Sequence, residues 1–237
     1  MNIDGRKAVR LLSLPETRYA EVWDLQHSIF SRLVVGERCD TLILCEHSPV
    51  YTLGRVTEEA NILFTDEELK KIGAEKFLVE RGGDVTFHGP GQLVGYPLLN
   101  LSHFKEDLGW YLRALEETII LTLKEYAVTG FRIPGRTGVW VGQAGDEEKI
   151  CAIGIKASRW CTMHGFAFNV STDLSYFERI IPCGIGDKKV TSLEKLLGKK
   201  VYMKEVRSHY AASFETVFGV ELQAIPADQA VAPAFVS

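Results

Sequence analysis

Long apolar runs and a secretion signal are both missing from this sequence. Its apolar runs, such as the one formed by Ile119, Ile120 and Leu121, are far shorter than the roughly 20 residues that a membrane-spanning helix needs. The first residues, MNIDGR, lack the basic-then-apolar layout of a signal peptide. These absences predict a soluble cytoplasmic protein that does not associate with membranes.

Paired cysteines, excess positive charge and nucleotide-binding motifs are also lacking. The cysteines are odd in number and form no C-x-x-C pair: Cys39, Cys45, Cys151, Cys161 and Cys183. This pattern predicts reduced thiols and neither a zinc site nor a disulfide framework.

The net charge of −4 gives no support to nonspecific nucleic-acid binding, which needs many phosphate-neutralising cations. The patterns G-x-G-x-x-G and G-x-x-x-x-G-K-[ST] are absent, so we expect no cofactor, no metal and no nucleic-acid partner.

What is present indicates a globular α+β protein. Apolar residues at three- and four-residue spacing predict helices over residues 19–33, 108–126 and 206–218, and capping boxes predict shorter helices starting at Thr65 and Thr191. Apolar or β-branched runs between turn residues predict strands over residues 41–46, 50–53, 77–81, 92–99, 138–142, 149–157 and 166–170. Because these strands come in adjacent pairs, we predict a mixed or mainly antiparallel sheet flanked by helices. One catalytic domain over residues 1–225 and a loose Ala/Pro-rich tail over residues 226–237 are expected.

The most unusual segment is RGGDVTFHGPGQ, residues 81–92. Its glycines let the backbone approach a ligand closely, and Gly89-Pro90-Gly91 favours a tight turn beside His88. A ligand pocket and an ordinary hairpin with polar flanks both remain open from these residues alone.

Two further segments carry chemically useful side chains. In KICAIGIK, residues 149–156, alternation predicts a strand with Lys149, Cys151 and Ile153 on one face. A surface lysine that ends a hairpin is the alternative to a lysine at the mouth of a pocket. Cys183 lies between Pro182 and Gly184, which favours an exposed loop, so it is a better nucleophile candidate than cysteines within apolar strands. A structural loop cysteine remains the alternative.

Six stretches between about residues 40 and 197 carry a family resemblance. They are EHSPVYTLGR (46–55), RGGDVTFHGPGQLVGYP (81–97), KICAIG (149–154), MHGFAFNV (163–170), IPCGI (181–185) and VTSL (190–193). In this order they resemble the lipoyl(octanoyl) transferase family, the octanoyl-[acyl carrier protein]:protein N-octanoyltransferases. The resemblance implies a fold shared with biotin and lipoate protein ligases, a mixed sheet flanked by helices.

The resemblance also implies the roles of individual residues. Cys183 matches the nucleophile that carries the acyl group as a thioester, and Lys149 matches the lysine that lowers the pKa of that cysteine. The implied acyl pocket consists of Arg81, Gly82, Gly83, Asp84, Val85, Thr86, Phe87, His88, Ala152, Ile153, Gly154, Gly165, Phe166 and Ala167. Side chains such as those of Ile153 and Phe166 are expected to sheath the acyl chain.

The implied reaction is the first step of endogenous lipoate biosynthesis. An octanoyl group moves from acyl carrier protein to a lysine of lipoyl domains in 2-oxoacid dehydrogenase and glycine cleavage complexes, without ATP. Lys149 and His88 are candidate proton acceptors for the attacking amine. Such partners are typically acidic, so a basic patch at the pairs Lys188/Lys189 and Lys199/Lys200 is the expected docking surface.

Three other functions stay open at this point. An ATP-dependent lipoate or biotin ligase would share the fold but form an acyl-adenylate. A carrier-binding module without activity would form no covalent adduct. A thiol hydrolase would release the free acid without an acceptor protein.

Overall fold

A mixed sheet forms the centre of the protein. The computed structural model describes residues 6–37, 39–181 and 189–227. In spatial order the main sheet contains β12 (Val220–Ala224), β1 (Lys7–Thr17), β2 (Thr41–His47), β6 (Gln92–Leu98), β10 (Cys161–Asn169), β9 (Glu148–Ser158), β8 (Arg136–Val141) and β7 (Phe131–Ile133), and β11 (Lys189–Val190) pairs with β9. The neighbours of β1 are parallel to it, as is β11 to β9, and the other pairs are antiparallel. The predicted mixed sheet is therefore confirmed.

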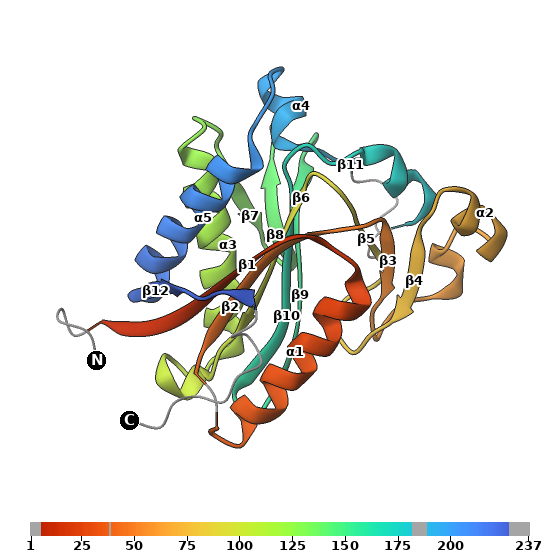
Figure 1. The fold of residues 1–237 in the computed structure, drawn as a ribbon. Coiled ribbons are helices and arrows are strands. Elements are labelled where there is room, and N and C mark those ends of the chain that lie inside the picture. The colour runs from red at the N-terminus through yellow and green to blue at the C-terminus, as the bar shows by residue number, and fades with distance from the viewer. Residues whose placement is uncertain (1–5, 38, 182–188, 228–237) are drawn as a thin grey trace.

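A second, smaller sheet was not anticipated as a separate unit. It consists of β4 (Glu75–Leu78), β3 (Val50–Leu53) and β5 (Thr86–His88), and it lies beside the main sheet (Figure 1). The strand predicted over residues 77–81 instead ends at Leu78. The chain after it turns toward the main sheet, where the backbone N–H of Gly82 donates to the carbonyl of Ile155 at 2.9 Å.

Helices cover both faces of the main sheet (Figure 1). They are α1 (Tyr19–Val34), α2 (Asp66–Lys71), α3 (Leu108–Lys124), α4 (Leu193–Leu197) and α5 (Met203–Phe218), with 3-10 turns η1 (Glu59–Asn61), η2 (Leu101–His103) and η3 (Leu174–Arg179). The three long predicted helices are confirmed. The apolar sides of α3 and α5 join one core cluster and that of α1 joins another. No helix within the described ranges is long and apolar enough to cross a membrane.

The two predicted capping boxes differ in outcome. At α2 the Thr65 hydroxyl accepts from the Glu68 N–H while the Glu68 carboxylate accepts from the Thr65 N–H, so the box is confirmed. At α4 the prediction was wrong by one residue. Ser192 is the N-cap, and the Glu194 carboxylate accepts instead from the backbone of Val201, beyond the helix.

A β-bulge changes which side chains of β9 share a face. The register between β8 and β9 shifts between Val139 and Trp140. As a result Ile150 and Cys151 are both fully buried in the core that packs against α3 and α5. The predicted strict alternation, with Lys149 and Cys151 on one face, was therefore wrong. A bulge inserts one extra residue into a strand and re-aims its neighbours, and here it turns Lys149 away from that core.

Candidate functional site

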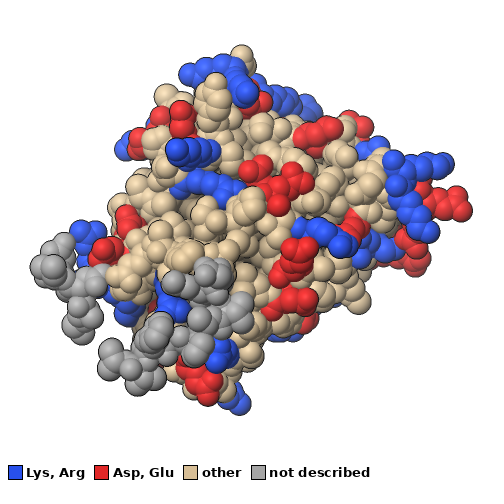
Figure 2. Space-filling model, in the orientation of Figure 1, with Lys and Arg blue, Asp and Glu red and all other residues tan. Residues whose placement is uncertain are grey.

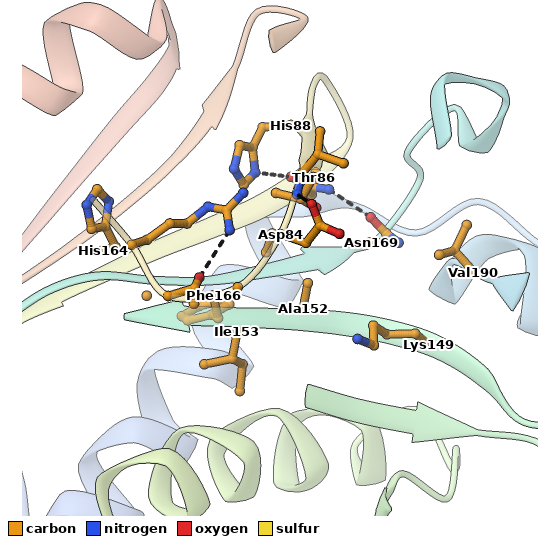
Figure 3. A pocket seen from close by; sticks show the side chains of 18 of the residues that line it. Asp84, Thr86, His88, Lys149, Ala152, Ile153, His164, Phe166, Asn169 and Val190 are labelled. Atoms are coloured by element: carbon orange, nitrogen blue, oxygen red, sulfur yellow. Dashed lines mark hydrogen bonds between the residues drawn. The ribbon is translucent and has the colours of Figure 1, made fainter. Parts of the chain in front are cut away.

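A pocket lies between the 81–88 segment and the strands β9 and β10 (Figure 3). Most residues of the predicted acyl pocket line it: Arg81, Gly82, Gly83, Asp84, Val85, Thr86, His88, Ala152, Ile153, Gly154, Gly165, Phe166 and Ala167. Lys149, predicted as a catalytic residue, also lines it. Its wall also includes Tyr19, Gln92, Tyr96, His164, Asn169, Phe177 and Val190. Tyr19, Tyr96, Phe177 and Val190 were not predicted individually as pocket residues. Tyr96 and Val190 lie within the stretches that carry the family resemblance, whereas Tyr19 and Phe177 had no such signal.

The predicted pocket residues differ in what they present to the cavity. Ala152 points toward the 81–88 segment, whereas Ile153 points to the opposite side of the strand (Figure 3). Ile153 packs against the core beneath the sheet, and the buried Phe166 ring lies 4.6 Å from that of Tyr210 in the same core. These two residues thus border the pocket mainly through their backbone. Phe87 does not line it, because its ring stacks on Tyr176 at 4.4 Å in another cluster.

Close backbone contact explains a glycine in the pocket floor. A Cβ atom on Gly154 would lie 2.7 Å from the carbonyl oxygen of Gly82, closer than real Cβ contacts. Only glycine at this position lets the 81–88 segment lie directly on β9.

Arg81 is held by hydrogen bonds to β3. Its guanidinium donates to the Thr52 hydroxyl at 3.2 and 3.0 Å and to the Thr52 carbonyl at 2.6 Å. Because the Thr52 hydroxyl accepts from Arg81, its own proton is directed to Nε2 of His88, 3.3 Å away. Nδ1 of His88 then donates to Oε1 of Gln92 at 2.9 Å. Burial, with the positive charge of Arg81 as a smaller cause, lowers the pKa of His88 to about 3, so this imidazole is neutral.

The same network continues toward Lys149. The Gln92 amide donates to Oδ1 of Asn169 at 2.9 Å, and the Asn169 amide donates to the Thr191 carbonyl at 3.1 Å. The Thr191 N–H in turn donates to the carbonyl of Lys149 at 3.0 Å. Hydrogen bonds through Thr52, His88, Gln92, Asn169 and Thr191 therefore connect the Arg81 end of the pocket with the strand that carries Lys149. Figure 3 draws the part of this network between His88 and Asn169.

Lys149 lies at the end of the pocket opposite His164 (Figure 3). Its Nζ lies 4.7 Å from the centre of the Trp140 ring, within the range of a cation–π interaction. Val190 pairs with Lys149 in the sheet. Lys156 lies further along β9, where its Nζ is 3.7 Å from Glu80.

Two more histidines are buried beside this network: His164 lines the pocket, and the His47 ring lies 6.0 Å from that of His88. Burial lowers the pKa values of His47 and His164 to about 4. Nδ1 of His47 donates to the Thr17 carbonyl at 2.9 Å, and its Nε2 accepts from the Tyr96 hydroxyl at 2.7 Å. His164 has a left-handed backbone with φ of 60°, and its Nε2 lies 3.7 Å from Glu80.

Most described cysteines are unsuited to nucleophilic attack. Burial raises the pKa of the Cys45, Cys151 and Cys161 thiols, which disfavours the reactive thiolate. Cys39 is exposed but does not line the pocket. Cys183 lies outside the described residues. The nearest described pocket residues on either side of it in the sequence are Phe177 and Val190.

Apolar and small residues line the pocket together with the cationic side chains of Arg81 and Lys149. Nothing in the described ranges gathers three or more histidine, cysteine or carboxylate side chains in a way that could hold a metal ion.

The sequence is similar to a family of known proteins over most of its length. The family model described as "Lipoyl protein ligase A/B catalytic domain" matches residues 18–215. An octanoyltransferase of Christiangramia forsetii is 45% identical over 230 residues, which cover 92% of this chain and 98% of the relative. An octanoyltransferase of Rubrobacter xylanophilus is 49% identical over 219 residues, which cover 91% and 96%.

Solved structures share the fold at low sequence identity. A bi-partite lipoate protein ligase from Thermoplasma acidophilum has a TM-score of 0.71 at 16% identity, with 94% of this chain and 89% of that chain covered. A lipoate-protein ligase A bound with ATP has a TM-score of 0.69 at 14% identity, with 94% and 91% covered. These matches show a common α+β architecture.

Proposed function

Because this chain belongs to the lipoyl protein ligase A/B catalytic domain family, we propose that it transfers octanoyl groups from acyl carrier protein to a lysine of lipoyl domains. The relatives at 45% and 49% identity are named octanoyltransferases. The acceptors proposed are the lipoyl domains of 2-oxoacid dehydrogenase and glycine cleavage complexes, and the compartment is the cytoplasm. The observation that carries the proposal is Lys149 at one end of a pocket whose floor is made of small residues.

The first step is a thioester exchange on Cys183. Its thiolate attacks the carbonyl carbon of the octanoyl thioester, a new carbon–sulfur bond forms, and the thiolate of the carrier leaves. One thioester replaces another, so no ATP is consumed. A free thiol has a pKa of about 8.5, which leaves only a few per cent as thiolate at neutral pH. The ammonium of Lys149 provides the nearby positive charge that lowers such a pKa.

The second step forms an amide on the acceptor. The lysine amine of the lipoyl domain attacks the Cys183 thioester, the carbon–sulfur bond breaks, and the Cys183 thiolate is regenerated while the amine loses a proton. His88 is poorly suited to take that proton, because its Nε2 already accepts from the Thr52 hydroxyl and burial lowers its pKa. Lys149 remains the candidate acceptor: its ammonium gives its proton to the departing carrier thiolate in the first step, so a neutral amine is present to take the proton of the acceptor lysine.

Intact-mass spectrometry tests both the reaction and its nucleophile. After incubation with octanoyl-carrier protein, the wild type is expected to gain one octanoyl mass and the Cys183→Ala variant none. Cys39→Ala, which removes an exposed thiol away from the pocket, is the matched control and should be acylated like the wild type. An adduct that persists in Cys183→Ala contradicts the assignment.

A second arm of the experiment separates transfer from ligation and hydrolysis. Added lipoyl domain should remove the adduct and gain the octanoyl mass itself. Free octanoate with ATP should modify neither protein. Modification that requires ATP would instead indicate a ligase, and release of free octanoate without an acceptor would indicate a hydrolase.

A further inference from the structure

A fully buried carboxylate, that of Glu116, reaches β8 from the helix α3. An ionised carboxylate is tolerated inside a protein only where opposite charges and hydrogen-bond donors surround it. Oε2 of Glu116 accepts from Nε of Arg132 at 3.0 Å and lies 2.7 Å from Nη1 of Arg113. Oε1 accepts from the backbone N–H of Gly138 at 3.0 Å. The two arginines therefore balance the charge through one oxygen, while the other oxygen holds the backbone of β8.

Gly138 lies directly beside the side chain of Lys149. A Cβ atom on Gly138 would lie 3.6 Å from Cε of Lys149, at ordinary van der Waals distance, and 2.5 Å from the carbonyl oxygen of Cys151. The φ of Gly138 is 119°, a conformation that residues with a side chain rarely adopt. Gly138 thus lies with its bare backbone against β9, and the end of the Lys149 side chain lies next to it.

Gly138 and Trp140 together determine where the ammonium of Lys149 lies. Nζ of Lys149 is 4.7 Å from the centre of the Trp140 ring. The register shift between β8 and β9 follows Gly138 by one residue, between Val139 and Trp140. Gly138 is buried, and a buried N–H without an acceptor is unfavourable. If Glu116 did not accept from it, β8 would have to shift toward another acceptor, and the surface on which Lys149 lies would shift with it.

We propose that Glu116 is a positioning residue for Lys149. Through the N–H of Gly138 it fixes the backbone beside the Lys149 side chain, and thereby holds the ammonium against Trp140 at its end of the pocket. Glu116 itself does not line the pocket, so it acts only through Gly138. The inference rests on the proposed function where it takes Lys149 to activate Cys183.

Two substitutions at Glu116 remove the hydrogen bond to Gly138 in different ways. Glu116→Gln has nearly the same size, but hydrogen bonds from charged donors are the stronger ones. Arg113 and Arg132 therefore attract its single oxygen, and its NH2 group is left facing the Gly138 N–H. Glu116→Leu removes every acceptor. Arg132→Met is the matched control, because it breaks one ion pair of the same carboxylate and leaves the bond to Gly138 in place.

NMR spectroscopy of protein labelled with 13C-lysine reports the position of Lys149 directly. The ring current of Trp140 should shift the ε-methylene protons of Lys149 upfield, and the signal is assigned by its loss in Lys149→Met. In both Glu116 variants this signal should move toward the position of an exposed lysine, and in Arg132→Met it should stay. If every Glu116 variant that is folded, by its thermal melt, keeps the wild-type signal, the positioning role is overturned. An equal movement in Arg132→Met would also overturn it, because the ion pairs would then be the cause.

Single-turnover acylation by octanoyl-carrier protein measures the consequence for the reaction. At saturating carrier protein the rate constant should fall by about tenfold or more in Glu116→Gln, since a small displacement of a catalytic group can cost about a hundredfold. The carrier concentration that gives half the maximal rate should not change, because Glu116 does not line the pocket. Arg132→Met should react at the wild-type rate.

The NMR signal needs no reaction, so it distinguishes this inference from the proposed function. If the wild type transfers nothing but the signal moves in the Glu116 variants and stays in Arg132→Met, the proposed function fails and the positioning role stands. If octanoyl transfer occurs and the Glu116 variants keep the wild-type signal, the positioning role fails and the function stands.

Discussion

The Nζ atom of Lys149 lies 4.7 Å from the centre of the buried Trp140 ring. The two residues are a pair across β8 and β9, at the register shift that turns Lys149 out of the core. The face of an indole attracts a cation, so the ring limits where the ammonium can go. The bulge and the ring together hold one positive charge at this end of the pocket.

Removing that charge should impair activation of Cys183. With Lys149→Met, the pKa of Cys183 should rise by about one to two pH units, because the thiolate loses its nearby ammonium. The thiolate fraction at neutral pH then falls about tenfold to a hundredfold, with partial compensation from higher nucleophilicity per thiolate. The measurement is iodoacetamide alkylation of Cys183 from pH 5 to 10, alongside single-turnover acylation.

Lys149→Arg separates the charge from the proton-acceptor role. Arginine keeps a positive charge but does not release its proton, so this variant should retain much of the thiolate while the second step slows. Lys156→Met is the control, since Lys156 lies near Glu80 further along the strand. An alkylation midpoint that stays at the wild-type pH in Lys149→Met would show that another group activates the cysteine.

The buried histidines should make folding stability depend on pH. Burial lowers the pKa of His164 to about 4, whereas an unfolded histidine titrates near 6.5. Between these values the unfolded chain binds a proton that the native protein does not, so stability falls as the pH is lowered from about 6.5 to 4. Each such histidine contributes up to about 1.4 kcal/mol per pH unit.

His164→Asn should weaken this dependence. Asparagine tolerates the left-handed backbone at this position, where φ is 60°, and it does not titrate. In urea unfolding, the loss of stability between pH 7 and pH 5 should be about 2 kcal/mol smaller than in the wild type. His209→Asn, on α5 away from the pocket, is the control. Equal losses in all three proteins would mean that His164 titrates normally in the native state.

The elements that the sequence predicted best are those with a local cause. The apolar stripes of α1, α3 and α5 and the Thr65 capping box each depend on residues within a few positions of one another. The glycines of the 81–92 segment made it a candidate for a ligand pocket, with an ordinary hairpin as the alternative, and the segment does border the cavity.

The features that escaped prediction depend on distant contacts. The bulge in β9 depends on how β8 pairs with it, and this pairing is invisible in the alternation of residues 149–157. Thr52 lies in an apolar strand and gave no sign that it would join Arg81 to His88. Tyr19 reaches the pocket only because α1 packs on the face of the sheet that carries Ala167.

The docking surface for acidic carriers is predicted at the end of the molecule near α4, where Figure 2 shows basic side chains. Lys199 and Lys200 line a shallow hollow there with Lys195. Lys189 forms an exposed ion pair with Asp146, and Lys188 lies outside the described residues. The remaining adjacent pair, Lys199 and Lys200, is therefore the surface to test.

Charge reversal at Lys199 and Lys200 should slow association with octanoyl-carrier protein. Electrostatic attraction between the partners acts mainly on their association rate, and salt screens it beyond about 8 Å at physiological ionic strength. The double variant to glutamate should associate about tenfold more slowly at low salt, with a flatter salt dependence, in stopped-flow measurements. The same reversal at Lys70 and Lys71, an exposed pair in α2, is the control. An equal effect at both pairs would indicate a general charge effect and no docking surface near α4.

The last prediction concerns Thr52, whose hydroxyl accepts from Arg81 and donates to His88. Thr52→Val keeps the shape but removes the hydroxyl, so a buried guanidinium loses an acceptor and Nε2 of His88 loses its donor. Leaving such groups unsatisfied costs about 1–3 kcal/mol each, so the free energy of unfolding in urea should fall by at least about 1 kcal/mol. Because the Arg81 stem forms the wall above Gly154, KM for octanoyl-carrier protein should rise as well.

Thr52→Ser retains the hydroxyl and should restore both KM and most of the stability. If Thr52→Val and Thr52→Ser lose the same stability and share one KM, altered packing around residue 52 is responsible, and the hydrogen bonds of the Thr52 hydroxyl to Arg81 and His88 do not hold the pocket in shape.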